Sequence, residues 1–189
     1  DQPRSRGLGD VYKRQVLIGG VDVRNIPSRE LMNLISFVFQ DTHLFKTSLL
    51  ENIRAARPDA TEKEALEAAH AAQCDDILAK MPQGIHTVVG TKGIYLSGGE
   101  QQRIALARAI LKDAPIVVLD EATAFADPEN EMLIQKAFET LTRGKTVLMI
   151  AHRLSTVQGA DRILVLESGV VAESGTHREL LERKGVYAA

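Results

Sequence analysis

Short hydrophobic runs separated by amphipathic stretches make up most of the chain from Val16 onward. Three of them, ISFVFQ (35–40), IVVLD (116–120) and TVLMIA (146–151), are short and continuous, which is typical of buried strands. RILVLES and GVVAES, around Ser168-Gly169, predict a further pair of strands joined by a turn. Because strands alternate with helical segments, the pattern indicates an α/β fold with a mostly parallel sheet covered on both faces.

Helical periodicity dominates the section between residues 41 and 112. Ser48 is expected to cap a short helix over 49–55. Thr61 and Glu64 have the spacing of a capping box, which predicts a helix over 62–73. We therefore expect a helical subdomain over 41–112, inserted between two parts of an α/β core, 16–40 and 113–189. Within the second part, further helices are expected over 129–141 and 178–183.

Residues 1–15, DQPRSRGLGDVYKRQ, differ from the rest of the chain in their pattern of apolar and charged residues. They carry four basic side chains without apolar periodicity, so no element of a packed sheet is predicted there. GLGDVYKRQ also resembles translated sequencing-adapter read-through. We expect a foreign or disordered tail on a truncated gene fragment, with the domain proper over 16–189.

Composition limits the classes of function that remain. The 189 residues suffice for one domain, and Lys+Arg 23 against Asp+Glu 25 gives a net charge of −2, which offers no broad surface for nucleic acid. The single Cys74 cannot form an internal disulfide, and no Cys/His cluster has metal-ligand spacing. No apolar run approaches the roughly 18 residues of a membrane span.

The segment Leu96-Ser97-Gly98-Gly99-Glu100-Gln101-Gln102-Arg103 precedes the helical run IALARAILK. Backbone N–H groups and the positive end of a helix dipole would converge there, which predicts a phosphate site. Taken alone, the segment is explained equally well as a serine N-cap with glycines in a turn.

Polar side chains also follow each predicted buried strand. Asp120 and Glu121 end the strand IVVLD, His152 follows TVLMIA, and Gln40 ends ISFVFQ. Parallel strands bring their carboxyl ends to one edge of a sheet, where α/β folds bind ligands. Asp127 lies shortly after the carboxylates, and Pro128 is expected to begin the next helix.

In this order, the motifs resemble the nucleotide-binding domain of ABC transporters. LSGGEQQR resembles the signature, IVVLDE the Walker B strand with its catalytic glutamate, and AFAD the D-loop. His152 resembles the switch histidine and Gln40 the Q-loop glutamine. The resemblance runs from about Val16 to the C-terminus. ENI (51–53), IAHRLSTV and GTHRELL make it most similar to exporter-type domains.

The resemblance implies a role for each of these residues. Asp120 and Gln40 would bind Mg²⁺, Glu121 would activate the attacking water, and His152 would contact the γ-phosphate of ATP. Gln40 would also couple the site to a transmembrane domain. A second nucleotide-binding domain would hold an ATP molecule that this chain contacts. The contacts would come from the signature residues Ser97, Gly98, Gly99 and Glu100 and from the D-loop residue Asp127. The domain would lie on the cytoplasmic face of the plasma (inner) membrane.

The P-loop pattern G-x-x-x-x-G-K-[ST] is not found in the sequence. The one Gly-Lys-Thr, 144–146, has Glu139 where the first glycine belongs, so we interpret it as a turn before a strand. We expect this chain alone to bind ATP weakly and to hydrolyse little. Two alternatives stay open: a degenerate partner subunit that contributes only its signature, and an ABC-type ATPase that acts outside transport.

Overall fold

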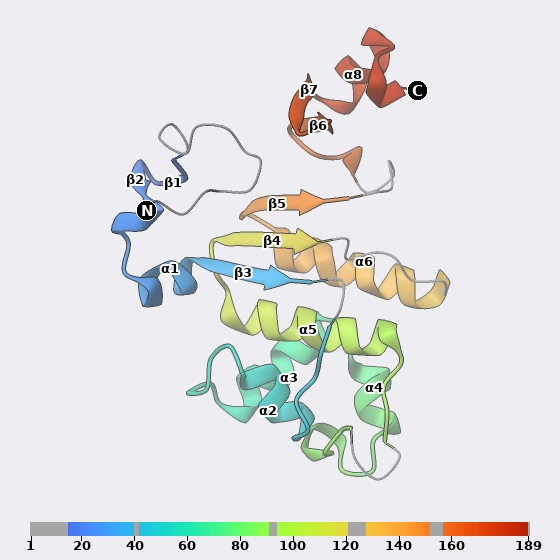
Figure 1. The fold of residues 1–189 in the computed structure, drawn as a ribbon. Coiled ribbons are helices and arrows are strands. Elements are labelled where there is room, and N and C mark those ends of the chain that lie inside the picture. The colour runs from blue at the N-terminus through green and yellow to red at the C-terminus, as the bar shows by residue number, and fades with distance from the viewer. Residues whose placement is uncertain (1–14, 40–41, 91–93, 121–127, 152–156, 189) are drawn as a thin grey trace. The chain divides into compact units, whose positions relative to one another are not determined.

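The computed structural model describes residues 15–39, 42–90, 94–120, 128–151 and 157–188 (Figure 1). The chain forms two compact units, one of residues 28–150 and one that combines residues 1–27 with 151–189. These units group the chain differently from the predicted boundaries near residues 16, 41 and 113, which stay predictions. The two units are described separately.

The larger unit contains a three-stranded parallel sheet. Its strands are β3 (Ile35–Val38), β4 (Ile116–Asp120) and β5 (Thr146–Ile150), in the order β3-β4-β5. In register, Phe37 pairs with Val118 and Val118 with Leu148. The parallel α/β arrangement that the sequence predicts is confirmed, and the carboxyl ends of all three strands lie along one edge (Figure 1).

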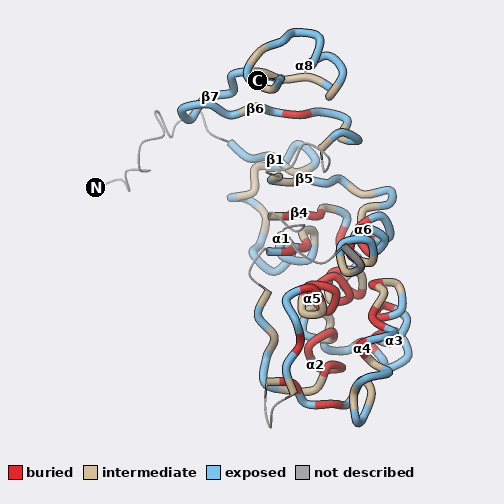
Figure 2. The backbone as a smooth tube through the Cα atoms, turned by 90° about the vertical axis from the view of Figure 1, so that its right-hand side faces the viewer, coloured by how far each residue is buried: buried red, intermediate tan, exposed pale blue. Residues whose placement is uncertain are grey.

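Six helices accompany this sheet in the part of the larger unit that the structure describes: α1 (Ser28–Leu34), α2 (Leu49–Arg54), α3 (Glu62–Ala71), α4 (Asp75–Lys80), α5 (Gly98–Lys112) and α6 (Pro128–Thr142). The central one is α5, which packs against α2, α3, α6 and β3. It buries Ile104, Leu106 and Leu111, and each such side chain contributes about 1.5–3 kcal/mol when it leaves water. Figure 2 shows buried residues concentrated along α5 and its neighbours.

The two faces of the sheet differ in burial. Val38, Val117 and Leu119 point into the core, together with residues of α5 and α6. On the opposite face, Phe37 is 44% exposed and Leu148 is 61% exposed. The sequence predicts a sheet covered on both faces. Among the described residues the core covers one face, and the other presents apolar side chains to solvent.

The described residues of the second unit include two hairpins, β1 (Leu17–Ile18) with β2 (Val21–Asp22) and β6 (Ile163–Glu167) with β7 (Val170–Gly175), the helix α8 (His177–Arg183), and two short 3-10 helices over Val23–Asn25 and Val186–Ala188. Ser168 and Gly169 connect β6 to β7 with φ of 50° and 81°. Two adjacent residues with positive φ are what a tight two-residue hairpin requires, so the predicted turn is confirmed.

Candidate functional site

The signature segment forms the start of helix α5. Ser97 has extended dihedrals, φ −63° and ψ 163°, and its hydroxyl accepts a hydrogen bond from the Glu100 N–H at 3.3 Å. The Glu100 carboxylate in turn accepts from the Ser97 N–H at 2.8 Å. The helix therefore begins at Gly98, earlier than the apolar run alone indicates, because this capping box fixes its first turn.

The first two residues of α5 are glycines, and this determines what the helix end can bind. Helix geometry leaves the N–H groups of Gly98 and Gly99 without intrahelical acceptors. Ser97 and Gly98 are exposed, whereas Gly99 is buried. Because Gly98 is exposed and has no side chain, an anion can approach the positive end of the 15-residue helix from that side. The arrangement fits a phosphate group.

The capping box is not specific to this segment. Thr61 with Glu64 begins α3, and Thr176 with Glu179 begins α8, both with the same reciprocal hydrogen bonds. The hydrogen bonds from Thr61 lower the pKa of Glu64, and those from Thr176 lower the pKa of Glu179. Capping alone therefore indicates no ligand. The α5 terminus differs from the other two because glycines follow its cap.

Asp120 is the last residue of β4, and its Cα pairs in register with Ile150 of β5. Strand alternation places it on the same face as Ile116 and Val118, opposite the buried Val117. It is half-buried, at the carboxyl edge of the sheet. A carboxylate in this position can supply the oxygen ligand that Mg²⁺ prefers.

The other predicted site residues, Gln40, Glu121, Asp127 and His152, lie outside the described residues. The strands that precede three of them are described: β3 before Gln40, β4 before Glu121 and β5 before His152. Among the described residues, no group of three His, Cys, Asp or Glu side chains is arranged to hold a metal ion. The joint geometry of these candidates stays a prediction.

Arg103, the last residue of the signature segment, is a functional candidate to which the sequence analysis assigned no role. Its side chain is 1% exposed. It donates to both carboxylate oxygens of Asp76 at 2.6 and 3.0 Å, to the Asn130 amide oxygen at 3.2 Å, and to the Gln73 carbonyl. Hydrogen bonds from Arg103 lower the pKa of Asp76. This network joins α5 to α4 and α6.

A second arginine, which is half-buried, holds α5 against α2. Arg108 donates to the Asn52 carbonyl at 2.9 Å and lies 5.7 Å from the centre of the Phe45 ring. Burial lowers the pKa of Arg108. The side chain of Asn52 is itself buried and bonds the backbone of Phe45 in both directions, at 2.8 and 3.0 Å. No sequence signal identified this pair, since its members are 56 residues apart.

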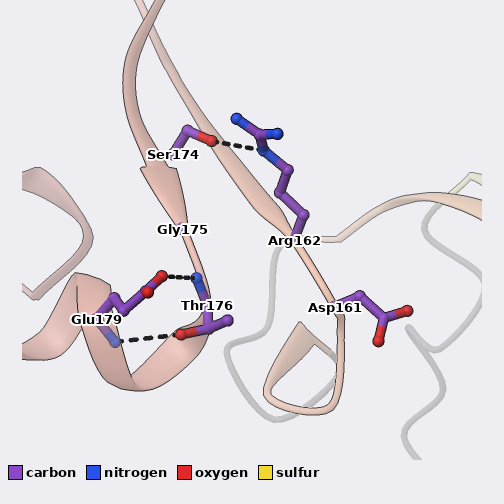
Figure 3. A pocket seen from close by; sticks show the side chains of 6 residues that line it. All are labelled: Asp161, Arg162, Ser174, Gly175, Thr176 and Glu179. Atoms are coloured by element: carbon purple, nitrogen blue, oxygen red, sulfur yellow. Dashed lines mark hydrogen bonds between the residues drawn. The ribbon is translucent and has the colours of Figure 1, made fainter.

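A hollow of about 240 Å³ lies in the other unit, between β6, β7 and α8 (Figure 3). Much of its polar lining is paired within the chain, since Arg162 donates to Ser174 and Glu179 accepts from the Thr176 N–H. No residue of the predicted site lines it. We therefore assign the candidate site to the start of α5 and the end of β4.

Known proteins that are similar to this chain identify its family. A family model described as "ABC transporter" matches residues 7–124, more than half of the chain. The chain belongs to the ABC transporter family. It is 48% identical over 178 residues to the ATP-dependent lipid A-core flippase of Syntrophus aciditrophicus (strain SB), and 46% identical to ABC transporter B family member 4 of Dictyostelium discoideum. Both matches cover 94% of this chain.

Among solved structures, this ABC transporter chain is similar to a bacterial Atm1-family ABC exporter with ATP bound. The TM-score is 0.84 at 40% identity, and the match covers 94% of this chain and 31% of the exporter. The chain likewise spans 30% of the flippase and 23% of the Dictyostelium protein. Its fold is that of an exporter-type ABC ATPase. In the described part of the chain, no helix is both long and apolar enough to cross a bilayer.

Proposed function

We propose that this chain is part of the ATP-binding domain of an exporter-type ABC transporter, and that it presents its signature segment to ATP held by a second nucleotide-binding domain. The observation that carries the proposal is the start of α5: an exposed, capped serine followed by two glycines whose N–H groups have no intrahelical acceptor. Such a terminus recognises a terminal phosphate without any cationic side chain.

In this proposal, Ser97 contributes its hydroxyl, and Gly98 and Gly99 contribute their N–H groups, to the γ-phosphate. The Glu100 carboxylate holds the cap and forms an ion pair with Lys80 at 3.6 Å, so it supports the segment. Because the donors are fixed by the helix before ATP arrives, no reorganisation is needed when charge develops on the phosphate.

The chain's own strand ends supply the remaining groups. Asp120 provides carboxylate oxygens for Mg²⁺, which when bound neutralises charge on the phosphates. Glu121 accepts a proton from the attacking water, and His152 donates to the γ-phosphate. Gln40 binds the metal and the attacking water and couples the site to the transmembrane domain. Asp127 contacts the second subunit. These roles rest on the family motifs.

The partners in this proposal are a transmembrane domain, either fused or separate, and a second nucleotide-binding domain. The complex couples ATP binding and hydrolysis to transport from the cytoplasmic face of the membrane. Since the sequence contains no P-loop pattern, we propose that the chain on its own binds ATP weakly. A degenerate subunit that contributes only its signature is the second candidate. Glu121 and His152 count against it, because such a subunit needs neither.

The first experiment titrates the purified 189-residue chain with Mg-ATP, with Glu121→Gln as the control that would trap ATP in a complete site. We expect no saturable binding up to millimolar ATP. Micromolar binding, tightened by Glu121→Gln, would show that some segment of this chain cradles the phosphates by itself.

The second experiment tests the signature. The chain is titrated into an ATP-loaded exporter nucleotide-binding domain that has its own P-loop and whose catalytic glutamate is replaced by glutamine. Ser97→Ala should weaken ATP-dependent association at least about tenfold, because a hydrogen bond to a charged group is lost. Thr61→Ala is the matched control, since it removes an identical capping box from α3. Equal effects of the two variants, or association without ATP, would refute the proposal.

A further inference from the structure

We propose that Asn130 is a positioning residue that holds the signature segment and the first turn of α6 in one fixed arrangement. The inference rests on the proposed function, because its consequence is that the signature segment keeps the geometry in which it meets the second subunit. Neither the family motifs nor the sequence pattern assigns a role to Asn130.

The first contact is with the signature itself. A Cβ placed on Gly99 would lie 3.0 Å from Asn130 Cγ, 3.1 Å from its Cβ and 3.3 Å from its Oδ1. These distances are shorter than ordinary van der Waals contact, so the Asn130 side chain occupies the space that any larger residue at 99 would need. The φ of Gly99 is not positive. Glycine is therefore favoured here by the closeness of α6 and not by backbone conformation.

The second contact is with Arg103. Asn130 Oδ1 accepts a hydrogen bond from Arg103 Nη2 at 3.2 Å, and the same nitrogen donates to Asp76 Oδ2 at 3.0 Å. The guanidinium is planar and rigid, so its geometry fixes the acceptors relative to one another. Asn130 thus lies beside Gly99 and accepts a hydrogen bond one helical turn later, from Arg103.

The location of Asn130 gives these contacts their significance. It is the third residue of α6, and Asp127 directly precedes that helix in the sequence. A shift of the first turn of α6 therefore moves the attachment point of the segment that contains Asp127. Through Asn130, the same shift acts on Gly99, whose N–H is proposed to bind phosphate. Asn130 is thus a polar contact that ties the first turn of α6 to the signature segment, beside the apolar packing of α5 against α6.

Three substitutions on α6 differ in what they remove. Asn130→Asp keeps the shape and the acceptor for Arg103. Asn130→Ala removes the acceptor and the amide atoms beside Gly99, and keeps the Cβ. Gln135→Ala is a matched control, because it removes an exposed amide side chain from the same helix.

Hydrogen exchange of the 189-residue chain, measured by mass spectrometry, provides the first test. Asn130→Ala should accelerate exchange of amides 101–106 about tenfold, the effect of losing roughly one hydrogen bond to a charged group. In Asn130→Asp and Gln135→Ala, the exchange rates of these amides should stay within about twofold of the wild-type rates. The amides of α3 should exchange at the wild-type rate in every variant. If Asn130→Ala does not unfold cooperatively, Asn130→Ser replaces it. Equal exchange in Asn130→Ala and Gln135→Ala, or an Asn130→Asp that behaves like alanine, would overturn the inference.

The second test uses association with the ATP-loaded domain described above. Asn130→Ala should weaken ATP-dependent association about tenfold, and Asn130→Asp should restore it. If the wild-type chain does not associate, the proposed function fails, whereas the exchange experiment still decides whether Asn130 holds the signature. If the wild-type chain associates and Asn130→Ala does so equally well, the positioning role is wrong although the function stands.

Discussion

Replacing Asp76 by alanine tests how strongly the helices around the signature depend on one ion pair. The substitution leaves the guanidinium of Arg103 buried at 1% exposure without its only carboxylate partner in the described structure. Removing one member of a fully buried pair costs about 3–5 kcal/mol. Because the Asp76 side chain is 41% exposed, we reduce the expected loss to about 2 kcal/mol. That corresponds to a Tm lower by roughly 4–8 °C for a chain of this size.

Replacing Arg103, the other member of the pair, should lower the stability of the chain less than replacing Asp76. In Arg103→Met the remaining Asp76 carboxylate can be hydrated, so the expected loss is about 1 kcal/mol, mainly from the unpaired Gln73 carbonyl. The double variant should match Arg103→Met and be more stable than Asp76→Ala alone, because the stranded charge is gone. Thermal and urea unfolding at neutral pH measure all four proteins. A loss under about 0.5 kcal/mol for Asp76→Ala, or a double variant less stable than it, would refute this reasoning.

The contribution of the Asp76–Arg103 pair to stability should depend on pH in one direction. Hydrogen bonds from Arg103 lower the pKa of Asp76 in the folded chain below its ordinary value of 3.8. Its contribution to stability is therefore complete above that unfolded value and is lost as the pH falls through the folded pKa. The stability difference between wild type and Asp76→Ala should be constant from about pH 5 to 8 and should shrink below about pH 4. A difference that grows on acidification would contradict the assigned pair.

Three further outcomes follow from the structure. Gly99→Ala should cost about 1–3 kcal/mol through its overlap with Asn130, whereas Gly159→Ala, with no atom within 4 Å of its added Cβ, should be neutral in the same unfolding assay. Cys74, whose pKa burial raises to about 12, should resist iodoacetamide in the folded chain and react only on unfolding, as mass spectrometry would show. Leu148→Thr should reduce concentration-dependent light scattering, because Leu148 is 61% exposed on the apolar sheet face; unchanged scattering would exclude that face as the cause.

The sequence predicted the elements well where a local signal exists. The capping residues Ser48 and Thr61 begin α2 and α3 as expected, and Pro128 begins α6. Predicted ends differ by one or two residues, as for α3, which ends at Ala71 and not at Gln73. The short helices α1 and α4 were not predicted, because six or seven residues carry too little periodicity and form through tertiary packing.

The candidate site was predictable to the extent that its chemistry is encoded in contiguous residues. The cap at Ser97 and the strand-end position of Asp120 are local properties, and the structure has both. The contacts of Arg103 with Asp76 and Asn130 each join residues 27 positions apart. No periodicity or propensity reports such contacts, since they depend on how α4, α5 and α6 pack.

Helix α5 also connects two distant parts of the larger unit mechanically. Its 15 residues form a rod about 22 Å long. At its far end, Lys112 donates to the Ile35 carbonyl at 2.6 Å, at the first residue of β3. Nearer its start, Arg103 bonds Asp76 of α4 and Asn130 of α6. One helix therefore links the glycines at 98 and 99 to the first residue of β3, the strand that precedes Gln40.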